Sequence, residues 1–470
     1  FFERSGLELV GDRLAVLGED DLARQVWFIR ASLAAHRANA VGIEDIFAPA
    51  AALATAGAAD RGRLVAAAVA VGDRLESLAL RGAEDATWIG LRSLMGRDWH
   101  LRPLGSDLYG GLPGVVVFLS YLAEVTGEER YRRLARAGWR TLWKEWQALR
   151  GVLTSIGGFD GWGGLLWTLA HLGRLWDDRT LLDEARSVLE LLPPLLARDT
   201  ALDVLNGTAG CLAGLLALHR TQPSQRALEL AAACGEHLVR QARPMERGAG
   251  WISSGMAGLA AEPLAGFAHG AAGIAWVLLE LAAETGDARF RRIALDAFEY
   301  ERTLFVPEQG NWRDVRQLEK LQLAKRVDGD TFMMAWCHGS PGAALARLRA
   351  LRHVEDPALR AEAEIAMAAT RAGGFDRSHC LCHGDLGNVE VFLQAAQVLG
   401  DRERWRAEVD RITGFVLDNI AEHGWRCGLP SAVEVPGLMA GIAGIGLGLL
   451  RLAEPERVPS VLVLEAPVPR

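Results

Sequence analysis

Apolar residues along the chain fall into two kinds of segment that alternate. The first kind is an almost unbroken apolar run that directly follows two glycines in the pattern GxxG. This unit occurs seven times, as GLPGVVVFLSYL from 111, GWGGLLWTLAHL from 161, GTAGCLAGLLAL from 207, GAAGIAWVLLEL from 270, GSPGAALARLRA from 339, GDLGNVEVFLQA from 384 and GIAGIGLGLLRL from 441. The first glycines of successive units lie 45 to 69 residues apart. That spacing leaves room for two helices of about 15–20 residues and their loops, so each unit is predicted to be one helical hairpin.

The second kind of segment is charged and amphipathic. Examples are EERYRRLARAGWRTLWKEW (128–146), RTLLDEARSVLELLPPLL (179–196) and DRERWRAEVDRITGFVLDNI (401–420). In the last of these, apolar residues recur at three- and four-residue steps, at Trp405, Val409, Ile412, Phe415, Val416 and Ile420. A helix with one apolar face packs at the surface of a domain, whereas a helix that is apolar on nearly every face packs inside.

This alternation predicts an all-α protein in which an inner ring of helices is wrapped by an outer ring. With a first outer helix around residues 62–80, the expected fold is an α/α toroid (double ring) of seven helical hairpins, with seven inner and seven outer helices. An open solenoid of stacked hairpins is the alternative. We favour closure because the inner runs are too apolar to line an open groove. Short strands are allowed in the link between residues 301 and 330.

One position in the repeat concentrates reactive side chains. If the first glycines are equivalent, the residue before each faces a common rim, where helix N-termini expose unpaired N–H groups and positive dipole ends. These residues are Gly110, Asp160, Asn206, His269, His338, His383 and Ala440. Three of the 11 histidines of the chain therefore occupy equivalent positions. Cysteines precede two of them, Cys337 before His338 and Cys382 before His383. The pattern therefore predicts that the reactive side chains of the protein gather at this rim.

A zinc site is the interpretation that fits this spacing of cysteine and histidine. Zinc accepts thiolate and imidazole ligands, and a catalytic zinc site uses three protein ligands and an open fourth position. Cys337, Cys382 and His383 fit that count, because successive hairpins of a ring bring the two cysteines together. The alternative is a pair of inert core cysteines.

Two neighbours could also take part in the zinc site. Cys380 could supply a third sulfur, but it lies two residues before Cys382 and is expected to point elsewhere. His338 could coordinate the metal instead of His383. We favour a place for His338 on the rim near the metal, as a candidate catalytic residue, over a solvated structural histidine.

An acidic residue is the remaining candidate for the rim. Asp203 lies four residues before Gly207 and could orient an imidazole across the rim or tune it electrostatically. The alternative role for Asp203 is a helix N-cap, for which Asn206 is better placed.

The composition limits which binding partners and which cellular compartment are expected for this chain. The net charge of −8, from 51 Lys+Arg against 59 Asp+Glu, and the lack of a dense basic block argue against nucleic acid or an anionic membrane surface as partner. The six cysteines are not spread as a disulfide framework would be, which favours a reducing compartment. The longest uncharged run, around residues 437–450, is too short and glycine-rich to span a bilayer. We therefore expect a cytoplasmic protein without membrane insertion.

Four rim motifs resemble those of the lanthionine cyclase (LanC-like) family. They are DVLNGTAG (203–210), GFAHGAAG (266–273), WCHGSPG (336–342) and CHGDLG (382–387). More narrowly, four other segments resemble the C-terminal cyclase half of class II lanthipeptide synthetases (LanM type): EDDLARQVWFIRASL (19–33), SDLYGGLPG (106–114), NWRDVR (311–316) and ERVPSVLVLE (456–465). The likeness runs from about residue 14 to the end of the chain.

The resemblance implies an α/α toroid, one Zn²⁺ ion, and addition of peptide cysteines to dehydroalanine or dehydrobutyrine to form (methyl)lanthionine thioether rings. It implies Cys337, Cys382 and His383 as zinc ligands, His269 as the acid/base histidine and Asp203 as an essential aspartate. Some members carry an arginine four residues before the first zinc cysteine, where this chain has Met333.

The resemblance also implies a division of the chain and a set of partners. Residues 1–60 are expected to form an N-terminal helical segment that links to an upstream domain, and residues 61–470 the LanC-like zinc cyclase domain. The upstream domain would be the dehydratase of class II synthetases, which this chain does not encode. The substrate would be a dehydrated, ribosomally made precursor peptide with its leader. Residue 1 is not methionine, which fits a part of a longer protein.

The chemistry explains these residue types. A free thiol has a pKa near 8.5 and is mostly protonated at neutral pH, whereas zinc coordination deprotonates it. Addition of the thiolate to the β-carbon creates an enolate, and His269 is the candidate general acid that protonates the α-carbon. The alternatives are a zinc-free toroid that binds peptides or sugars, a zinc-thiolate enzyme such as a protein prenyltransferase, and a LanC-like enzyme that adds glutathione.

Overall fold

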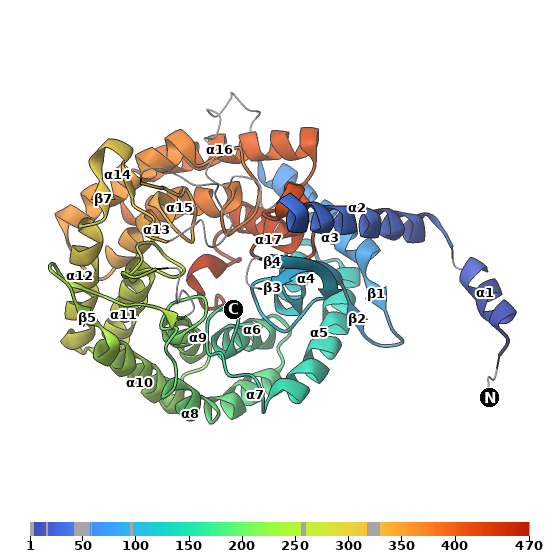
Figure 1. Ribbon diagram of the computed structural model, residues 1–470, viewed down its shortest axis with the longest axis horizontal. Helices are drawn as coiled ribbons and strands as arrows, with labels where there is room; N and C mark the ends of the chain where they lie inside the picture. Colours follow the sequence, from blue (N-terminus) through green and yellow to red (C-terminus); the bar gives the residue numbers. More distant parts are fainter. Residues whose placement is uncertain are drawn as a thin grey trace.

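Helices alternate between an inner and an outer position along most of the chain (Figure 1). The computed structural model describes residues 4–15, 17–41, 57, 59–94, 97–254, 260–316 and 330–469. Within these residues, seven helices form the inner ring: α4 (Leu112–Thr126), α6 (Trp162–Leu175), α9 (Thr208–Thr221), α11 (Ala271–Thr285), α13 (Ser340–Ala350), α15 (Asp385–Val398) and α17 (Ile442–Ala453). Seven more form the outer ring: α3 (Arg61–Leu78), α5 (Glu129–Leu149), α7 (Arg179–Leu189), α10 (Gln225–Gln241), α12 (Ala288–Arg302), α14 (Pro357–Gly373) and α16 (Arg402–His423). The α/α toroid predicted from the sequence is confirmed.

Each inner helix packs against one outer helix. The pairs are consecutive in the chain, except that the last inner helix, α17, pairs with the first outer helix, α3. All residues in the first two turns of every inner helix are buried, which explains why these runs are apolar on all faces. None of the described helices is long and apolar enough to cross a membrane.

Backbone hydrogen bonds close the inner ring at one end. The residue two positions before each first glycine donates its N–H to the carbonyl of the equivalent residue in the next unit, over 2.8 to 3.4 Å. The donors and acceptors run from Tyr109 to Phe159, Leu205, Ala268, Cys337, Cys382 and Met439, and from Met439 back to Tyr109. Seven equivalent positions thus form an unbroken circle. The open solenoid is excluded, and Cys337 and Cys382 are direct neighbours in the circle.

The second glycine of each GxxG pattern lets these loops pack closely. A Cβ atom on Gly210 would lie 2.0 Å from the carbonyl oxygen of Val204 and 2.1 Å from the backbone nitrogen of Gly158. No side chain fits in that space, so any substitution would push two neighbouring units of the ring apart.

One amphipathic stretch is divided where the sequence suggested a single segment. Residues 179–196 form α7 and a separate short helix, α8 (Leu192–Leu196). Pro193 and Pro194 stand at the start of α8 and lack the N–H groups that would continue the hydrogen-bond ladder of α7. The break therefore follows from the two prolines.

Four short antiparallel hairpins decorate the ring. They are β1 (Leu80–Arg81) with β2 (Ala86–Thr87), β3 (Ile89–Leu94) with β4 (Arg97–Pro103), β5 (Arg243–Pro244) with β6 (Ala249–Gly250), and β7 (Phe305–Val306) with β8 (Asn311–Trp312). Only β7 and β8 lie in the link where strands were allowed, and residues 317–329 of that link are outside the described residues. The expectation of helix elsewhere is wrong at the other three hairpins. The strands β1, β2, β5 and β6 have two residues each, too few for a periodic pattern, whereas β3 and β4 have six and seven.

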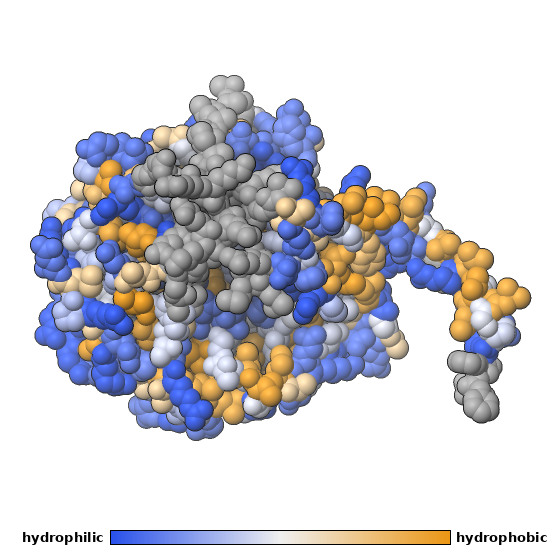
Figure 2. Space-filling model, in the orientation of Figure 1, coloured by the Kyte–Doolittle hydropathy of each residue, from blue (hydrophilic) through white to orange (hydrophobic). Residues whose placement is uncertain are grey.

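Two helices precede the ring. The first, α1 (Gly6–Ala15), has no buried residue and projects away from the toroid (Figure 1). The second, α2 (Glu19–Val41), packs against β4 and α3, and the indole of Trp27 donates to the carbonyl of Glu434 over 2.8 Å. Apolar side chains along both helices are exposed, as the orange surface in Figure 2 shows: Leu7, Leu9, Val10, Leu14, Leu17, Leu22, Val26, Ile29 and Leu33.

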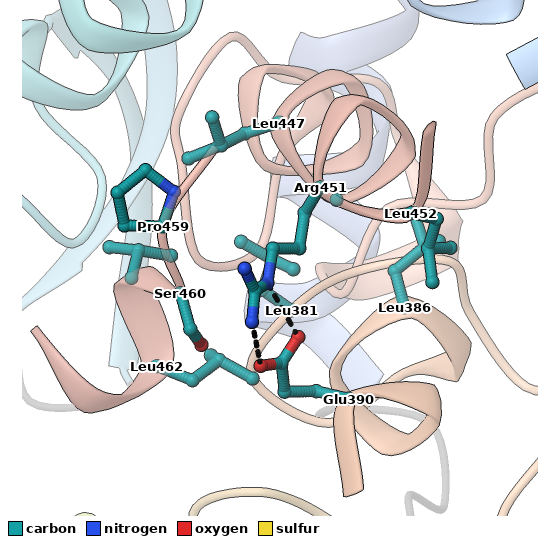
Figure 3. Close-up of a pocket in the computed structure, with 11 residues that line it drawn as sticks. Leu381, Leu386, Glu390, Leu447, Arg451, Leu452, Pro459, Ser460 and Leu462 are labelled. Atoms are coloured by element: carbon teal, nitrogen blue, oxygen red, sulfur yellow. Dashed lines mark hydrogen bonds and ion pairs between the residues drawn. The ribbon is translucent and has the colours of Figure 1, made fainter. Parts of the chain in front are cut away.

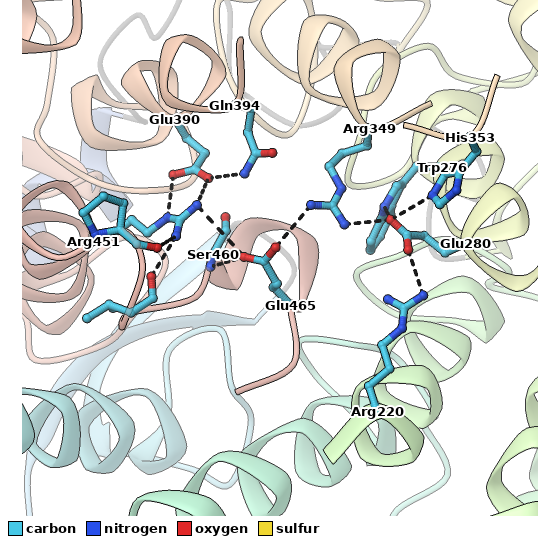
Figure 4. A network of polar contacts seen from close by, with 12 residues as sticks. Arg220, Trp276, Glu280, Arg349, His353, Glu390, Gln394, Arg451, Ser460 and Glu465 are labelled. Carbon is cyan, nitrogen blue, oxygen red and sulfur yellow. Dashed lines mark hydrogen bonds and ion pairs between the residues drawn. The ribbon is translucent and has the colours of Figure 1, made fainter. Parts of the chain in front are cut away.

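Charged side chains fill the end of the ring where the inner helices finish. Figure 3 shows Arg451 of α17 beside Glu390 of α15. Figure 4 extends this contact into a network in which Arg349 bridges Glu280 at 2.7 Å and Glu465 at 3.2 Å. Glu465 belongs to the segment after α17, so the network ties the end of the chain to the inner helices. Its charges compensate one another, which indicates a structural role.

Glu280 should be the most important member of this network for stability. Its side chain is 5% exposed and contacts Arg220, Arg349 and His353. We expect Glu280→Gln to lower the free energy of unfolding in urea by about 1.5–3 kcal/mol, because it removes the charge that buried Arg349 and half-buried Arg220 share, and leaves each with one more exposed carboxylate. The matched control is Glu284→Gln, which removes a more exposed partner of Arg220 and should cost less than about 1 kcal/mol. Equal effects of both variants would contradict this role.

The stability that Glu280 contributes should depend on pH in a defined direction. Burial opposes the ionised form of Glu280, but its cationic neighbours hold its pKa well below the usual range. A lowered pKa in the folded state stabilises the fold above the ordinary pKa of glutamate. The difference in stability between the parent chain and Glu280→Gln should therefore shrink as the pH falls through that range towards the folded-state pKa.

Candidate active site

Three rim histidines lie on consecutive units of the ring, as the glycine register predicts. His269, His338 and His383 precede α11, α13 and α15, whose N-termini converge at this end. The rings of His269 and His338 stack with centroids 5.7 Å apart and an interplanar angle of 23°. The structure therefore brings the predicted rim residues together, next to positive helix ends.

The two cysteine thiols of the circle are in contact. The backbone N–H of Cys337 donates to the carbonyl of Cys382 over 3.4 Å. A hydrogen bond between their side chains lowers the pKa of Cys337 to about 6 and raises that of Cys382 well above its ordinary value. One thiol of the pair is therefore easier to ionise than the other.

The imidazole of His383 is fixed by a backbone carbonyl. Its Nε2 lies 3.0 Å from the carbonyl oxygen of Gly428. A carbonyl oxygen can only accept, so Nε2 carries a proton, and Nδ1 is the nitrogen that would bind a metal once it has lost its own proton. Ligating histidines are commonly held in this way. Burial opposes a charge on the ring, but the Cys380 thiol beside it raises the pKa of His383 to about 9.

Cys380 does not point away from this cluster, as its spacing suggested. Its sulfur and Nε2 of His383 lie 2.5 and 2.6 Å from the position that a Cβ atom of residue 428 would take, so Gly428 is the only residue type that leaves both in place. The hydroxyl of Ser378 also donates to the Cys380 sulfur over 3.3 Å. The expectation failed because the chain turns tightly between residues 380 and 383.

These donors suit zinc in type, although they are not yet grouped around one point. In the described part of the chain, no set of three or more Cys, His, Asp or Glu side chains is arranged to hold a metal ion. Cys337 and Cys382 are nevertheless neighbours in the circle, and Nε2 of the next residue, His383, is fixed by the carbonyl of Gly428. Two thiolates and an imidazole are the ligands that zinc prefers in proteins.

The aspartate and the histidine predicted to work together are hydrogen-bonded. Nδ1 of His269 lies 2.9 Å from Oδ2 of Asp203, which is buried. The hydroxyl of Ser253 donates to the same oxygen over 2.9 Å, and the backbone N–H of Asn206 donates to Oδ1 over 2.7 Å. Asp203 is therefore placed to orient the imidazole of His269.

The proposed capping roles are not what the structure shows. Asp199 accepts the backbone N–H of Thr208 over 2.9 Å at the start of α9. The side chain of Asn206 instead donates to Asp160 over 2.6 Å. Neither Asp203 nor Asn206 caps the helix, because Asp199 folds back from the preceding loop to do so.

His338 is buried, at 3% exposure, so a solvated structural histidine is excluded. Burial, together with the charge of Arg316, lowers the pKa of His338 well below its ordinary value. Its Nε2 has no hydrogen-bond partner among the described residues. A neutral imidazole with an unused nitrogen thus stacks beside His269.

Sequence reasoning missed two residues near the cysteines. The hydroxyl of Tyr109 is hydrogen-bonded to Cys382. Tyr109 holds the same position in its unit as the two cysteines, so counting two residues before each glycine would have found it. The second is Arg316, paired with Asp314. It lies outside the repeat, and only the NWRDVR segment indicated it.

Comparison with known proteins gives three findings. A family model described as lanthionine synthetase C-like protein matches residues 102–463. The lacticin 481/lactococcin biosynthesis protein LcnDR2 of Lactococcus lactis subsp. lactis is 27% identical over 214 residues, which are 43% of this chain. The chain spans 22% of the length of that relative. Among solved structures, nisin cyclase matches over 76% of this chain and 92% of its own, with 20% identity and a TM-score of 0.58, a likeness that shows the fold.

Proposed function

The chain belongs to the lanthionine synthetase C-like family, and from this premise we propose that it forms (methyl)lanthionine rings by adding peptide cysteines to dehydroalanine or dehydrobutyrine. The observation that carries the proposal is the meeting, at one rim, of the Cys337–Cys382 pair with the Asp203–His269 pair. The cysteine pair suits binding of a metal that activates a thiol, and the Asp203–His269 pair suits proton transfer.

The reaction is an addition followed by a proton transfer. The thiolate of a peptide cysteine forms a bond to the β-carbon, and the π electrons of the dehydro residue move to its α-carbon and carbonyl oxygen. The resulting enolate takes a proton at the α-carbon. The proton released by the thiol balances the proton taken up, so the peptide keeps its mass while it loses one thiol per ring.

His269 is the group that delivers this proton. The carboxylate of Asp203 accepts a hydrogen bond from Nδ1, so Nε2 is the nitrogen that exchanges protons with the substrate. An imidazole in this arrangement can accept a proton at Nε2 and pass it to the substrate. Asp203 positions the ring and stabilises its charged form, as carboxylates do beside catalytic histidines.

Cys337, Cys382 and His383 are the proposed holders of one Zn²⁺ ion. Zinc at this place would supply the ionisation of the peptide thiol at neutral pH. The neighbouring positions of the two cysteines in the circle and the fixed Nε2 of His383 support the assignment.

Gly428 tests the zinc assignment without changing a ligand. In Gly428→Ala the new methyl group would collide with the Cys380 sulfur and with Nε2 of His383. We expect zinc affinity, measured by chelator competition, to fall by about 10–100-fold, the usual cost of disturbing a group that orients a ligand. Gly151→Ala, at a glycine with nothing near its Cβ position, is the control and should bind zinc normally. Unchanged affinity in Gly428→Ala would argue against His383 as a ligand.

The partners and the compartment belong to the same proposal. The likeness to LcnDR2 supports the narrower resemblance to the cyclase part of class II synthetases, with a dehydratase region upstream and a dehydrated precursor peptide as substrate. All six cysteines are unpaired, which suits the reducing cytoplasm.

The test is incubation of the chain with zinc and a dehydrated precursor that contains cysteine. Loss of alkylatable thiols without a change in peptide mass supports the proposed function. Thiols that persist with the parent chain would contradict it. A glutathione-adding enzyme would instead increase the mass of a cysteine-free dehydrated peptide by one glutathione per modified residue.

A further inference from the structure

A buried ion pair near the rim has no part in the reaction described so far. Nη2 of Arg316 lies 2.6 Å from Oδ2 of Asp314, and Nε lies 2.9 Å from Oδ1. The two side chains are 8% and 2% exposed. Burying a charged pair is costly, and replacement by apolar side chains is often neutral or stabilising. Such a pair beside a reactive site is therefore a candidate for function.

The segment that carries this pair lies against the loop of Cys337 and His338. Nη2 of Arg316 is 2.9 Å from the sulfur of Met333, four residues before Cys337. The side chain of Asn311 donates to the carbonyl of Met333 over 2.9 Å, and the hydroxyl of Ser340 donates to the carbonyl of Gly310 over 3.0 Å. Residues 310–316 and 333–340 thus support each other, and the guanidinium is held at the base of the cysteine loop.

The charge of Arg316 reaches the reactive sulfurs. Burial opposes this charge, but Asp314 and, beyond it, Cys337 and Cys382 raise the pKa of the guanidinium, which stays protonated. Asp314 engages Nε and Nη2. Among the described residues, the partners of the guanidinium are bonded to Nε and Nη2, and none to Nη1.

The reaction needs a cation of this kind. Addition of a thiolate creates an anion on the carbonyl oxygen of the dehydro residue, and His269 gives up its proton during the reaction. Arg316 keeps its charge throughout, because arginine does not lose its proton in proteins.

We propose that Arg316 is a further catalytic residue, whose guanidinium donates a hydrogen bond to the carbonyl oxygen of the dehydro residue as the sulfur–carbon bond forms. This inference rests on the proposed function. No proton leaves Arg316: the electron pair moves from the double bond to the oxygen, and returns to the α-carbon when that carbon is protonated. Asp314 is a positioning residue that fixes the direction of the guanidinium.

The same segment offers a matched control. Arg313 lies three residues before Arg316 but is 40% exposed and 3.8 Å from Asp330. Both variants remove one positive charge from the same segment. Arg313→Gln removes it at the surface, and Arg316→Gln removes it beside the site. A general effect of net charge or of this segment on folding would appear in both variants.

The experiment measures cyclisation of a dehydrated precursor by zinc-loaded parent, Arg313→Gln and Arg316→Gln chains. We expect kcat of Arg316→Gln to fall about 10²–10³-fold, the usual cost of removing one donor to a developing oxyanion, with KM within about twofold of the parent. Arg313→Gln should match the parent in both. A normal kcat in Arg316→Gln, or a raised KM with normal kcat, would overturn the proposal, since the second result identifies a residue that only binds peptide.

Chemical rescue separates a catalytic from a structural role. Millimolar guanidinium chloride should restore part of the lost kcat of Arg316→Ala, whereas sodium chloride at equal ionic strength should not. Equal effects of the two salts would overturn the catalytic role. If the parent chain itself leaves all thiols unreacted, the proposed function fails. If the parent cyclises and Arg316→Gln matches it, only this inference fails.

Discussion

His269→Ala should keep its zinc and its peptide affinity but cyclise about 10²–10⁴-fold more slowly, the range that general acid–base assistance supplies. His269 has no cysteine beside it, since Ala268 precedes it, and its Nδ1 is engaged by Asp203. Its available Nε2 is the nitrogen that we assign to proton transfer, because the two thiols and one imidazole that zinc needs are supplied by Cys337, Cys382 and His383. Single-turnover rates of thiol loss, with zinc content and peptide binding measured on the same sample, check this expectation.

Asp203→Asn is the companion variant. It keeps the shape of the side chain but removes the charge that stabilises a protonated His269, so it should slow the same step of the reaction.

Two outcomes for His269→Ala would contradict its assigned role. If this variant loses zinc, His269 is a metal ligand and the proposed division of roles is wrong. If it cyclises at the normal rate, His269 takes no part in catalysis.

Cys382→Ala should reduce bound zinc from about one equivalent to almost none, and cyclisation with it. Two of the three proposed ligands are thiols, and loss of one leaves too few donors for a stable site. Metal analysis after dialysis against a weak chelator gives the answer directly. Cys337→Ala should behave in the same way.

The chain contains its own control for this experiment. Cys211 and Cys234 form a second pair of buried, hydrogen-bonded thiols, between α9 and α10 and away from the rim register. Cys234→Ala also removes one thiol of a buried pair but should keep its zinc. A full equivalent of tightly bound zinc in Cys382→Ala would refute the ligand assignment, and loss of zinc in Cys234→Ala would indicate a general folding defect.

The closed ring and the position of the site could be predicted because both depend on a repeated backbone requirement. Each GxxG pattern marks the same turn into an inner helix, so its register fixes which residues become neighbours. The circle of hydrogen bonds through Cys337 and Cys382 follows that register. The contact between Asp203 and His269 follows it as well, since each stands at the entrance to its own inner helix.

The remaining features depend on contacts that no periodic pattern encodes. The strands β3 and β4 are set by their pairing with each other, and the cap by Asp199 comes from a loop nine residues before the residue that it binds. Arg316 meets Met333 because residues 310–316 fold back on the cysteine loop, across a link with no repeat of its own. Cys380 turns towards His383 because Gly428, from a distant segment, leaves space for both.

The exposed apolar side chains of α1 and α2 are another feature that the repeat does not explain. Their residues lie within the segment 1–60 that the resemblance assigned to a link with an upstream domain, and residues 42–56 are outside the described part of the chain. The sequence shows that α1 and α2 are helical and partly apolar. Contact with the core of the ring already begins on α2, where Trp27, Ala31 and Ala35 are buried.

Cyclisation in D₂O tests the central claim, that this rim joins a thiolate to a β-carbon and protonates the α-carbon. The proton delivered through His269 exchanges with solvent, so each thioether ring formed in D₂O should carry one deuterium at its α-carbon that persists after return to H₂O. Mass spectrometry of the product should therefore show one added deuterium for each thiol lost, and none when the parent chain is omitted. Thiol loss without retained deuterium would contradict the account, because the thiols would then have been consumed by a reaction other than addition to a dehydro residue.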